Sequence, residues 1–255
     1  MTPSAHIINP QVEHAHTHTI IFLHGRDSTN KEFANELFES EATEPAGQPR
    51  TLRDLFPTVR WIFPAAPTLR STRFNTDMSQ WFDMWSVENP AEQSEVQHEG
   101  LRRSIAAVLD IVASEEAIVK YRPRSIFLAG ISQGFAAVVA AFFAGAGGRA
   151  SLAGLMGLCS WMPLGGKDEL MRMIGCGSDS AGALKLSDLS MLPSTPIFLS
   201  HSSDDDVVPV QNGRTLRGII GQSQAVEWHE YEEGGHWINE PEGVDDIASF
   251  LRRHM

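Results

Sequence analysis

The sequence has few cysteines, no long apolar run and little positive charge, and each of these features argues against one class of protein. Cys159 and Cys176 are its only cysteines among 255 residues, which excludes a disulfide framework and predicts a reducing, cytoplasmic environment. No apolar stretch approaches the ~20 residues that a bilayer-spanning helix needs. The formal net charge of −12 argues against binding to nucleic acid or to an anionic membrane through bulk electrostatics.

The N-terminal segment, residues 1–18, is polar and rich in histidine. It has neither the basic nor the apolar region of a secretion signal, so we do not expect secretion. Three of its histidines alternate directly before an apolar run and would share one face of a strand: His14, His16 and His18. A metal site there is the less favoured interpretation, because solvated histidines at the entry of a strand are commoner.

Short apolar runs alternate with segments of helical periodicity along the rest of the chain. We expect strands at 19–23, 59–63, 125–129, 152–158, 196–200 and 226–231. We expect helices at 30–38, 101–112, 133–144, 213–220 and 244–253. This alternation predicts a parallel sheet with helices on both faces, in a single α/β domain spanning residues 1–255.

The passage from strand to helix at 125–144 contains a pattern of chemical significance. Residues 130–134 read Gly-Ile-Ser-Gln-Gly, which fits the G-x-S-x-G form of a nucleophile elbow. A serine on such a sharp turn needs neighbours without side chains, and Gly130 and Gly134 provide them. The following helix directs free N–H groups toward the place where an oxyanion would form. Ser132 is therefore a candidate nucleophile, although glycines also flank serine in ordinary strand–helix turns.

A serine nucleophile needs a histidine base, which in this kind of fold comes later in the chain. Four histidines follow Ser132. We choose His236, because it lies in a glycine-containing loop after strand 226–231, where parallel-sheet enzymes place catalytic groups. The other three lie at a strand end, within a strand and at the chain end, and we expect structural or solvated roles for them: His201, His229 and His254.

The acid and the second oxyanion donor are placed by their position after predicted strands. The acid should come from Asp204-Asp205-Asp206, but only one of these carboxylates can approach the imidazole, and the pattern alone does not choose among them. The oxyanion would be bound by the backbone N–H groups of Arg26 and Gln133. For the side chain of Arg26 we expect a surface salt bridge.

Together these motifs resemble the acyl-protein thioesterase/carboxylesterase (lysophospholipase-like) family of small α/β-hydrolases. The similarity runs in order along most of the chain, through F-L-H-G at 22–25, P-x-A-P at 64–67, M-x-x-W-F-D at 78–83, the elbow at 130–134, W-x-P-L at 161–164 and H-x-x-x-D-x-x-V-P at 201–209. The W-F-D segment is the most specific of these. The resemblance selects Asp205 as the acid beside Ser132 and His236.

The resemblance implies an α/β-hydrolase fold and hydrolysis of carboxylic esters or thioesters through an acyl-enzyme. It implies no metal and no cofactor. The substrate would be a small-molecule or lipid acyl ester or thioester, or an acylated protein. A non-catalytic receptor or interaction module of the same fold is the alternative, since fold does not determine function. It is less favoured, because every triad position is filled.

Departures from the family pattern concern the substrate more than the reaction. Asp27 and Ser28 stand where the family has glycine and aspartate, so the oxyanion loop is expected to bend differently. Phe135 replaces a glycine just beyond the elbow, and we place it at the substrate-binding site with Trp81 and Trp161. The aromatic stretch 64–93 is either a lid or a packed loop. We expect its Trp81 to be exposed and to line either the site entrance or a dimer contact.

Residues 164–192 are longer than the corresponding stretch of the family and predict an insertion or a lid-like loop. Its flexible apolar side chains would wall an acyl pocket: Leu170, Met171, Met173 and Met191. A simple surface excursion explains the segment equally well.

Overall fold

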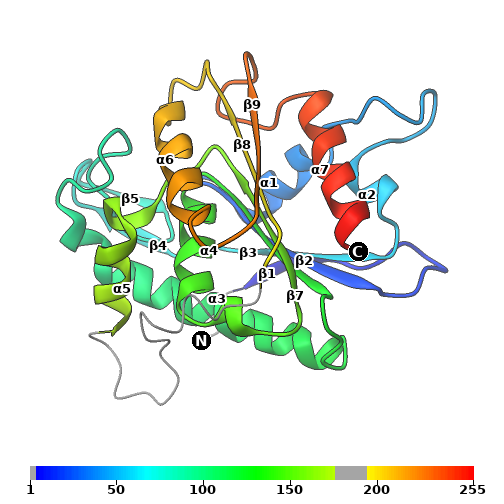
Figure 1. The fold of residues 1–255 in the computed structure, drawn as a ribbon, viewed down its shortest axis with the longest axis horizontal. Coiled ribbons are helices and arrows are strands. Elements are labelled where there is room, and N and C mark those ends of the chain that lie inside the picture. Colours follow the sequence, from blue (N-terminus) through cyan, green and yellow to red (C-terminus); the bar gives the residue numbers. More distant parts are fainter. Residues whose placement is uncertain (1–3, 176–193) are drawn as a thin grey trace.

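The computed structural model describes residues 4–175 and 194–255. Its main sheet has seven strands in the order β1-β3-β2-β6-β7-β8-β9 (Figure 1). The strands are β1 (Ala5–Ile8), β2 (His18–Leu23), β3 (Val59–Pro64), β6 (Ile126–Ile131), β7 (Leu152–Leu158), β8 (Ile197–Ser202) and β9 (Val226–Tyr231). All neighbouring strands are parallel except β1, which pairs antiparallel with β3. The predicted mostly parallel sheet is confirmed.

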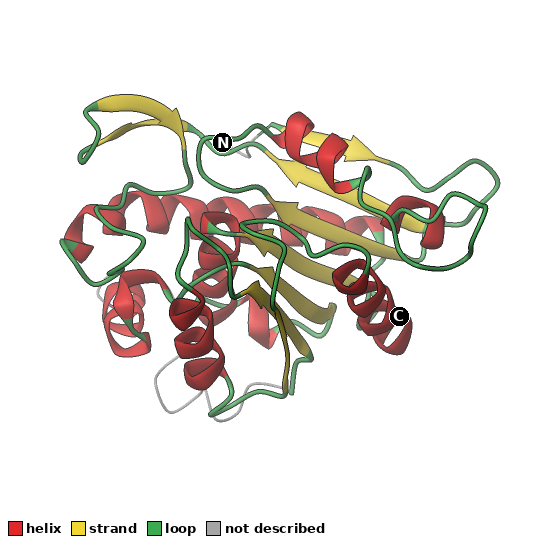
Figure 2. Cartoon of the chain, turned by 90° about the horizontal axis from the view of Figure 1, so that it is seen from above, coloured by secondary structure: helices red, strands yellow, loops and turns green. Residues whose placement is uncertain are grey.

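Helices cover both faces of this sheet (Figure 2). They are α1 (Asn30–Leu37), α2 (Leu52–Leu55), α3 (His98–Ile118), α4 (Gln133–Phe143), α5 (Lys167–Gly175), α6 (Val210–Ile220) and α7 (Glu242–His254), with short 3₁₀ turns η1 (Ser94–Gln97), η2 (Ala146–Gly148) and η3 (Pro163–Gly165). Alternation along β2 sends Ile21 and Leu23 into the core with α3, α4 and α6, and Ile20 and Phe22 into the core with α1, α2 and α7. Within the described part of the chain, no helix combines the length and the apolarity that crossing a membrane requires.

Three strands were not predicted from the sequence. Strand β1 lies inside the polar segment 1–18, where four residues are too few to display an alternating pattern. Strands β4 (Thr68–Ser71) and β5 (Thr76–Ser79) form a separate antiparallel hairpin within the stretch 64–93. Both hairpin strands are largely solvent-exposed, so they lack the apolar periodicity that marks a strand in sequence.

The first part of the expected insertion forms η3 and α5. Leu170, Met171 and Met173 are buried in the core on the α3 and α4 side, so the interpretation of these side chains as a pocket wall is wrong. Their spacing places them on one face of α5, and that face packs inward. Residues 176–192, including Met191, lie outside the described residues.

Candidate active site

Ser132 occupies the sharp turn between β6 and α4. Its backbone has φ 55° and ψ −128°, a sparsely populated conformation for a residue with a side chain. A Cβ atom on Gly130 would lie 2.4 Å from the backbone N of Phe135, and one on Gly134 would lie 2.3 Å from the carbonyl oxygen of Leu23. Both contacts are impossible, so the turn requires glycine on either side of Ser132.

The close approach of Gly134 brings the loop after β2 against the elbow. A Cβ on Gly25 would lie 3.5 Å from the Cβ of Ser132 and 4.0 Å from its Oγ. In the described structure, the backbone N–H groups of Arg26 and Gln133 donate no hydrogen bond. Two backbone donors are thus left free, one in the loop beside Ser132 and one at the start of α4.

His236 and Asp205 meet at the carboxyl ends of β8 and β9. Nδ1 of His236 donates to Oδ2 of Asp205 over 2.8 Å. The other carboxylate oxygen accepts from the backbone N–H groups of Val207 (2.9 Å) and Val208 (2.8 Å). Burial raises the pKa of Asp205, but these bonds and one from His201 outweigh it and hold the pKa well below its usual range. Asp205 is therefore ionised whenever the protein is folded near neutral pH.

The neighbours of Asp205 have different positions. The carboxylate of Asp204 accepts from the backbone N–H groups of Gly235 (2.8 Å) and Gly234 (3.3 Å), so it holds the loop that carries His236. Asp206 is exposed to solvent. The structure thus brings only Asp205 of this acidic run to the imidazole of His236.

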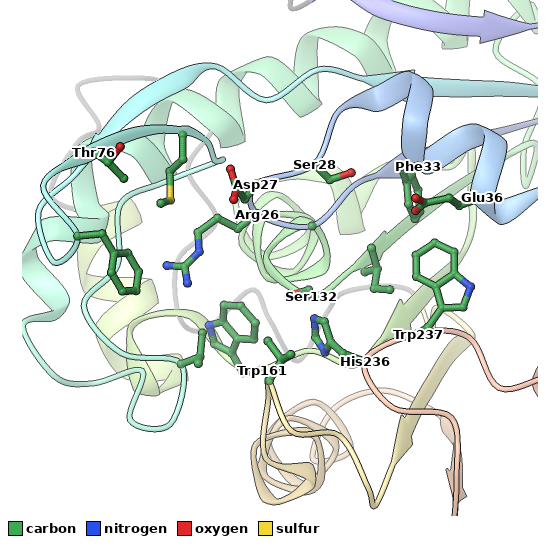
Figure 3. Close-up of a pocket in the computed structure, with 16 residues that line it drawn as sticks. Arg26, Asp27, Ser28, Phe33, Glu36, Thr76, Ser132, Trp161, His236 and Trp237 are labelled. Carbon is green, nitrogen blue, oxygen red and sulfur yellow. The ribbon is translucent and has the colours of Figure 1, made fainter.

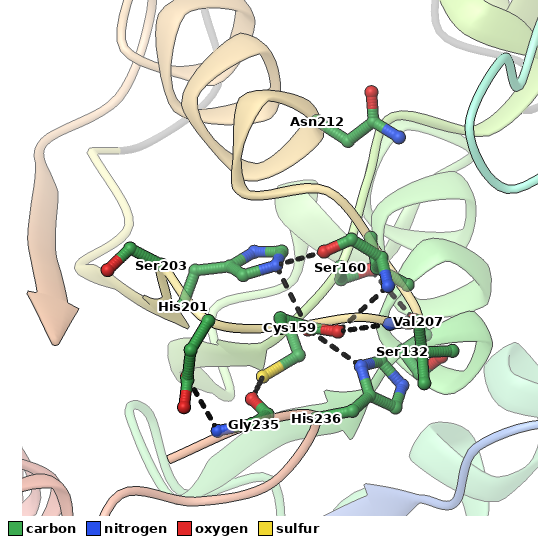
Figure 4. Close-up of polar contacts among 12 residues, drawn as sticks. Ser132, Cys159, Ser160, His201, Ser203, Val207, Asn212, Gly235 and His236 are labelled. Carbon is green, nitrogen blue, oxygen red and sulfur yellow. Dashed lines mark hydrogen bonds and ion pairs between the residues drawn. The ribbon is translucent and has the colours of Figure 1, made fainter. Parts of the chain in front are cut away.

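His201 has a closer relation to the site than the sequence indicated. It is buried, and its Nε2 lies 2.8 Å from the carbonyl oxygen of Val208 and 3.1 Å from Oδ2 of Asp205. His201 and His236 both contact Oδ2 of Asp205, and Figure 4 shows these two imidazoles with their dashed contacts. The predicted structural role is compatible with this position, but the contact with the acid was missed. The only feature of the sequence that indicates this contact is the four-residue spacing between His201 and Asp205.

Ser132 and His236 both line a cavity of about 540 Å³. Its wall is mostly apolar and comes from six segments of the chain. The other lining residues are Gly25, Arg26, Asp27, Ser28, Phe33, Glu36, Phe74, Thr76, Met78, Val87, Ile131, Trp161, Val207 and Trp237. Figure 3 shows Arg26 and Thr76 on one side of Ser132, and Phe33, Glu36 and Trp237 on the other. The cavity therefore extends in two directions from the serine.

Of the three side chains placed at the substrate-binding site, only Trp161 lines this cavity. Trp81 is 1% exposed, and its indole N–H donates to the carbonyl oxygen of His24 over 2.8 Å. The side chain of Gln133 bonds both the N–H of Trp81 (2.9 Å) and the carbonyl oxygen of Phe82 (2.8 Å). Trp81 is thus part of a packed loop clamped to the elbow, and the expectation of an exposed residue is wrong.

Phe135 is also away from the cavity. It is fully buried in the core, and its ring lies so close to Gly157 of β7 that a Cβ there would stand 2.3 Å from it. Three positions beyond Ser132, a side chain of α4 faces the sheet rather than the cavity. The ring of Phe135, at the position where the family has glycine, therefore fills space between α4 and β7 and does not reach the substrate-binding cavity.

The side chain of Arg26 does not form the expected surface salt bridge. No carboxylate of the described residues pairs with it, and its guanidinium lies over the ring of Phe74 at 5.4 Å. It is half-buried and lines the cavity. This residue belongs to the site through its side chain as well as its backbone.

Three side chains at the site have the atoms of a metal site. The ligand atoms of Cys159, Asp205 and His236 lie within 4.8 Å of one another. Burial, together with the charge of Asp205, raises the pKa of the Cys159 thiol, so it is protonated rather than a thiolate ligand. Both oxygens of Asp205 already accept hydrogen bonds. The set therefore matches a hydrogen-bonded network better than a metal centre, and the expected absence of a metal stays a prediction.

The N-terminal histidines do not share a strand face. Strand β2 begins at His18, so His14 and His16 precede it, and His18 is buried against Phe127. The favoured interpretation of solvated histidines is therefore wrong for His18, which is buried, and the absence of a metal there stays a prediction.

We expect Gln133→Ala to lower the free energy of unfolding by about 2–4 kcal/mol, because the N–H of Trp81 and the carbonyl of Phe82 would both lose their buried partner. Denaturant unfolding of the variant and of the wild type measures this difference. Gln222→Ala, at an exposed turn, is the matched control and should change stability by less than about 0.5 kcal/mol. An equal effect of the two substitutions would contradict the clamp.

A strained serine at a strand–helix turn, beside a histidine–aspartate pair at the carboxyl edge of a mostly parallel sheet, defines the class of α/β-hydrolases. The family model described as phospholipase/carboxylesterase matches residues 3–169 and 165–255. The chain belongs to this family, and it is accordingly an ester or thioester hydrolase. This favours the enzyme over the non-catalytic receptor.

Relatives and solved structures agree with this assignment. The chain is 27% identical over 245 residues to acyl-protein thioesterase 1 of Yarrowia lipolytica, covering 94% of this chain and 93% of that one. It is 29% identical to the Schizosaccharomyces pombe protein of the same name, over 86% of this chain and 81% of the relative. The crystal structure of Zea mays acyl-protein thioesterase 2 superposes with a TM-score of 0.69 at 22% identity, covering 99% of both chains. At 22% identity, this structural similarity establishes the fold and not the activity.

Proposed function

We propose that this protein is a serine hydrolase that cleaves carboxylic esters or thioesters through Ser132, His236 and Asp205. One observation carries the proposal. A 2.8 Å hydrogen bond joins Nδ1 of His236 to Asp205, in a cavity that His236 shares with Ser132 on its strained turn. With Nδ1 donating to the acid, Nε2 is the nitrogen left to accept a proton from the serine.

In the first half of the reaction, Oγ of Ser132 attacks the acyl carbonyl and His236 takes the hydroxyl proton. The backbone N–H groups of Arg26 and Gln133 bind the negative oxygen of the tetrahedral intermediate. Their lack of other acceptors in the described structure supports this role. His236 then gives its proton to the leaving alcohol or thiol, and the acyl group stays on Ser132.

In the second half, His236 removes a proton from water as the water attacks the acyl-enzyme. Collapse of the second intermediate releases the carboxylic acid, and the proton returns from His236 to Ser132. The ionised Asp205 orients the imidazole and stabilises its cation in both halves. No metal and no cofactor takes part in the proposed sequence.

The substrate we propose is a small-molecule or lipid acyl ester or thioester, or an acylated protein. The apolar wall of the cavity supports an acyl group, and the names of the relatives support thioesters and acylated proteins. We also propose action in the cytoplasm, which the free thiol of Cys159 supports.

A series of p-nitrophenyl esters of increasing acyl length, beside matched acyl thioesters, tests this proposal. We expect turnover of both classes, with kcat/KM rising about four-fold per added methylene until the chain outgrows the cavity, because each buried methylene contributes about 0.8 kcal/mol. Ser132→Ala protein provides the background rate. A protein that hydrolyses no member above that background would contradict the proposed function.

A further inference from the structure

One end of the cavity carries a cation that forms no ion pair with any carboxylate of the described residues. The guanidinium of Arg26 lies on the opposite side of Ser132 from Glu36 (Figure 3). The guanidinium stacks on the ring of Phe74, which occupies its flat face and leaves the N–H groups at the edge. Burial and the nearby Arg73 lower the pKa of Arg26, although a guanidinium stays charged at any physiological pH.

The acidic groups near Arg26 do not pair with it. The carboxylate of Asp83 accepts from the N–H and hydroxyl of Thr72, and that of Glu88 accepts from Ser86 and faces Arg73 at 3.8 Å. Asp27 also lines the cavity, but it is exposed and forms no ion pair with Arg26 among the described residues. These carboxylates attract the guanidinium from a distance and leave its donors unoccupied.

A second donor lies on the same side of Ser132. The indole of Trp161 is 1% exposed, and its Nε1–H has no hydrogen-bond acceptor in the described structure. Figure 3 shows Trp161 toward Arg26 and away from Trp237. A buried donor without an acceptor is costly, so this end of the cavity is suited to a group that brings oxygen acceptors.

We propose that the end of the cavity formed by Arg26 and Trp161 binds an anionic group of the substrate, a carboxylate, and so selects acidic esters or thioesters. This inference rests on the proposed function and names a substrate class for it. A guanidinium presents its N–H groups in a fork that matches two carboxylate oxygens. Among the described residues that line the cavity, Arg26 is the only lysine or arginine, whereas the other end carries the carboxylate of Glu36, so we expect the anionic group at the Arg26 end.

Two pairs of substrates test this inference, one for each half of the substrate. The acyl arm compares mono-p-nitrophenyl glutarate with p-nitrophenyl valerate. The leaving-group arm compares the butyryl thioester of 3-mercaptopropionate with that of 1-propanethiol. For each enzyme we take the ratio of kcat/KM for the anionic substrate to that for its neutral partner, which cancels any effect of a substitution on the shared chemistry.

We expect this ratio to fall about tenfold in one arm for Arg26→Gln, because a charge-assisted hydrogen bond is lost. Arg26→Lys should restore part of it. Arg73→Gln, which removes the other guanidinium over Phe74, is the matched control and should change the ratio by less than twofold. Increasing salt should lower the wild-type ratio, since the site is open to solvent.

Two results overturn the inference and differ in their meaning. If Arg26→Gln changes neither ratio by more than twofold while the neutral substrates are still hydrolysed in a Ser132-dependent way, the anion site is wrong and the proposed function stands. If the wild-type enzyme hydrolyses neither member of either pair, the proposed function fails and the inference falls with it.

Discussion

Replacement of Ser132 by alanine is expected to lower kcat by about 10⁶-fold on the best ester of the series, since the elbow would have no hydroxyl for His236 to deprotonate. The methyl side chain leaves the backbone turn and its flanking glycines unchanged. The folded structure should therefore persist, and the thermal unfolding of the two proteins should agree closely. Steady-state hydrolysis at matched enzyme concentrations measures the loss.

A residual rate within about tenfold of the wild type would contradict the role of Ser132. A loss of activity together with loss of the folded structure would not test the role, and circular dichroism separates the two cases. Ser132→Gly provides the second variant for that purpose, because glycine adopts φ 55° without strain and should stabilise the turn by about 1 kcal/mol.

Replacement of Asp205 by asparagine is expected to lower kcat by about 10⁴-fold, because an amide favours the wrong tautomer of His236 and cannot stabilise its cation. Its neighbours in the sequence supply matched controls. Asp206→Asn, at an exposed position, should leave the rate within about twofold. Asp204→Asn should lie between the two, since it weakens the hold on the loop that carries His236. Equal rates for the Asp205 and Asp206 variants would contradict the assignment of the acid.

The same carboxylate makes stability depend on pH. Because its folded pKa lies below the unfolded value of about 3.9, Asp205 stabilises the folded state above roughly pH 5, and this contribution is lost as pH falls toward the folded pKa. The difference in free energy of unfolding between wild type and Asp205→Asn should therefore be constant from neutral pH to about pH 5 and shrink below it. A difference that grows on acidification would contradict the depressed pKa.

The elements around Ser132 were predictable because their signals are local. The apolar runs of β2, β6 and β7 are buried on both faces, so they read as continuous strands, and the flanking glycines of the elbow are required by backbone contacts within a few residues. The meeting of His236 with Asp205 was within reach because both follow parallel strands that end at the same edge. The choice of Asp205 over Asp204 needed the family resemblance.

The side chains around the cavity were less predictable, because they depend on contacts between distant segments. Trp81 was placed at the surface by its aromatic loop, whereas the side chain of Gln133, 52 residues away, holds it in the core. Phe135 fits because Gly157 lies beneath it. Whether Arg26 would find a carboxylate partner depended on its neighbour Asp27 and on two acids of another segment, Asp83 and Glu88. No local pattern in the sequence shows with which groups these acids pair.

In the proposed reaction, Ser132 carries the acyl group between the two halves. The most direct test of this role is mass spectrometry of the wild-type enzyme quenched in acid during turnover of a p-nitrophenyl ester, with Ser132→Ala as the parallel sample. We expect one added acyl group per chain, located on the peptide that contains Ser132 and absent from the variant. Turnover without any acyl group on that peptide, or with the same group on another residue, would contradict this role.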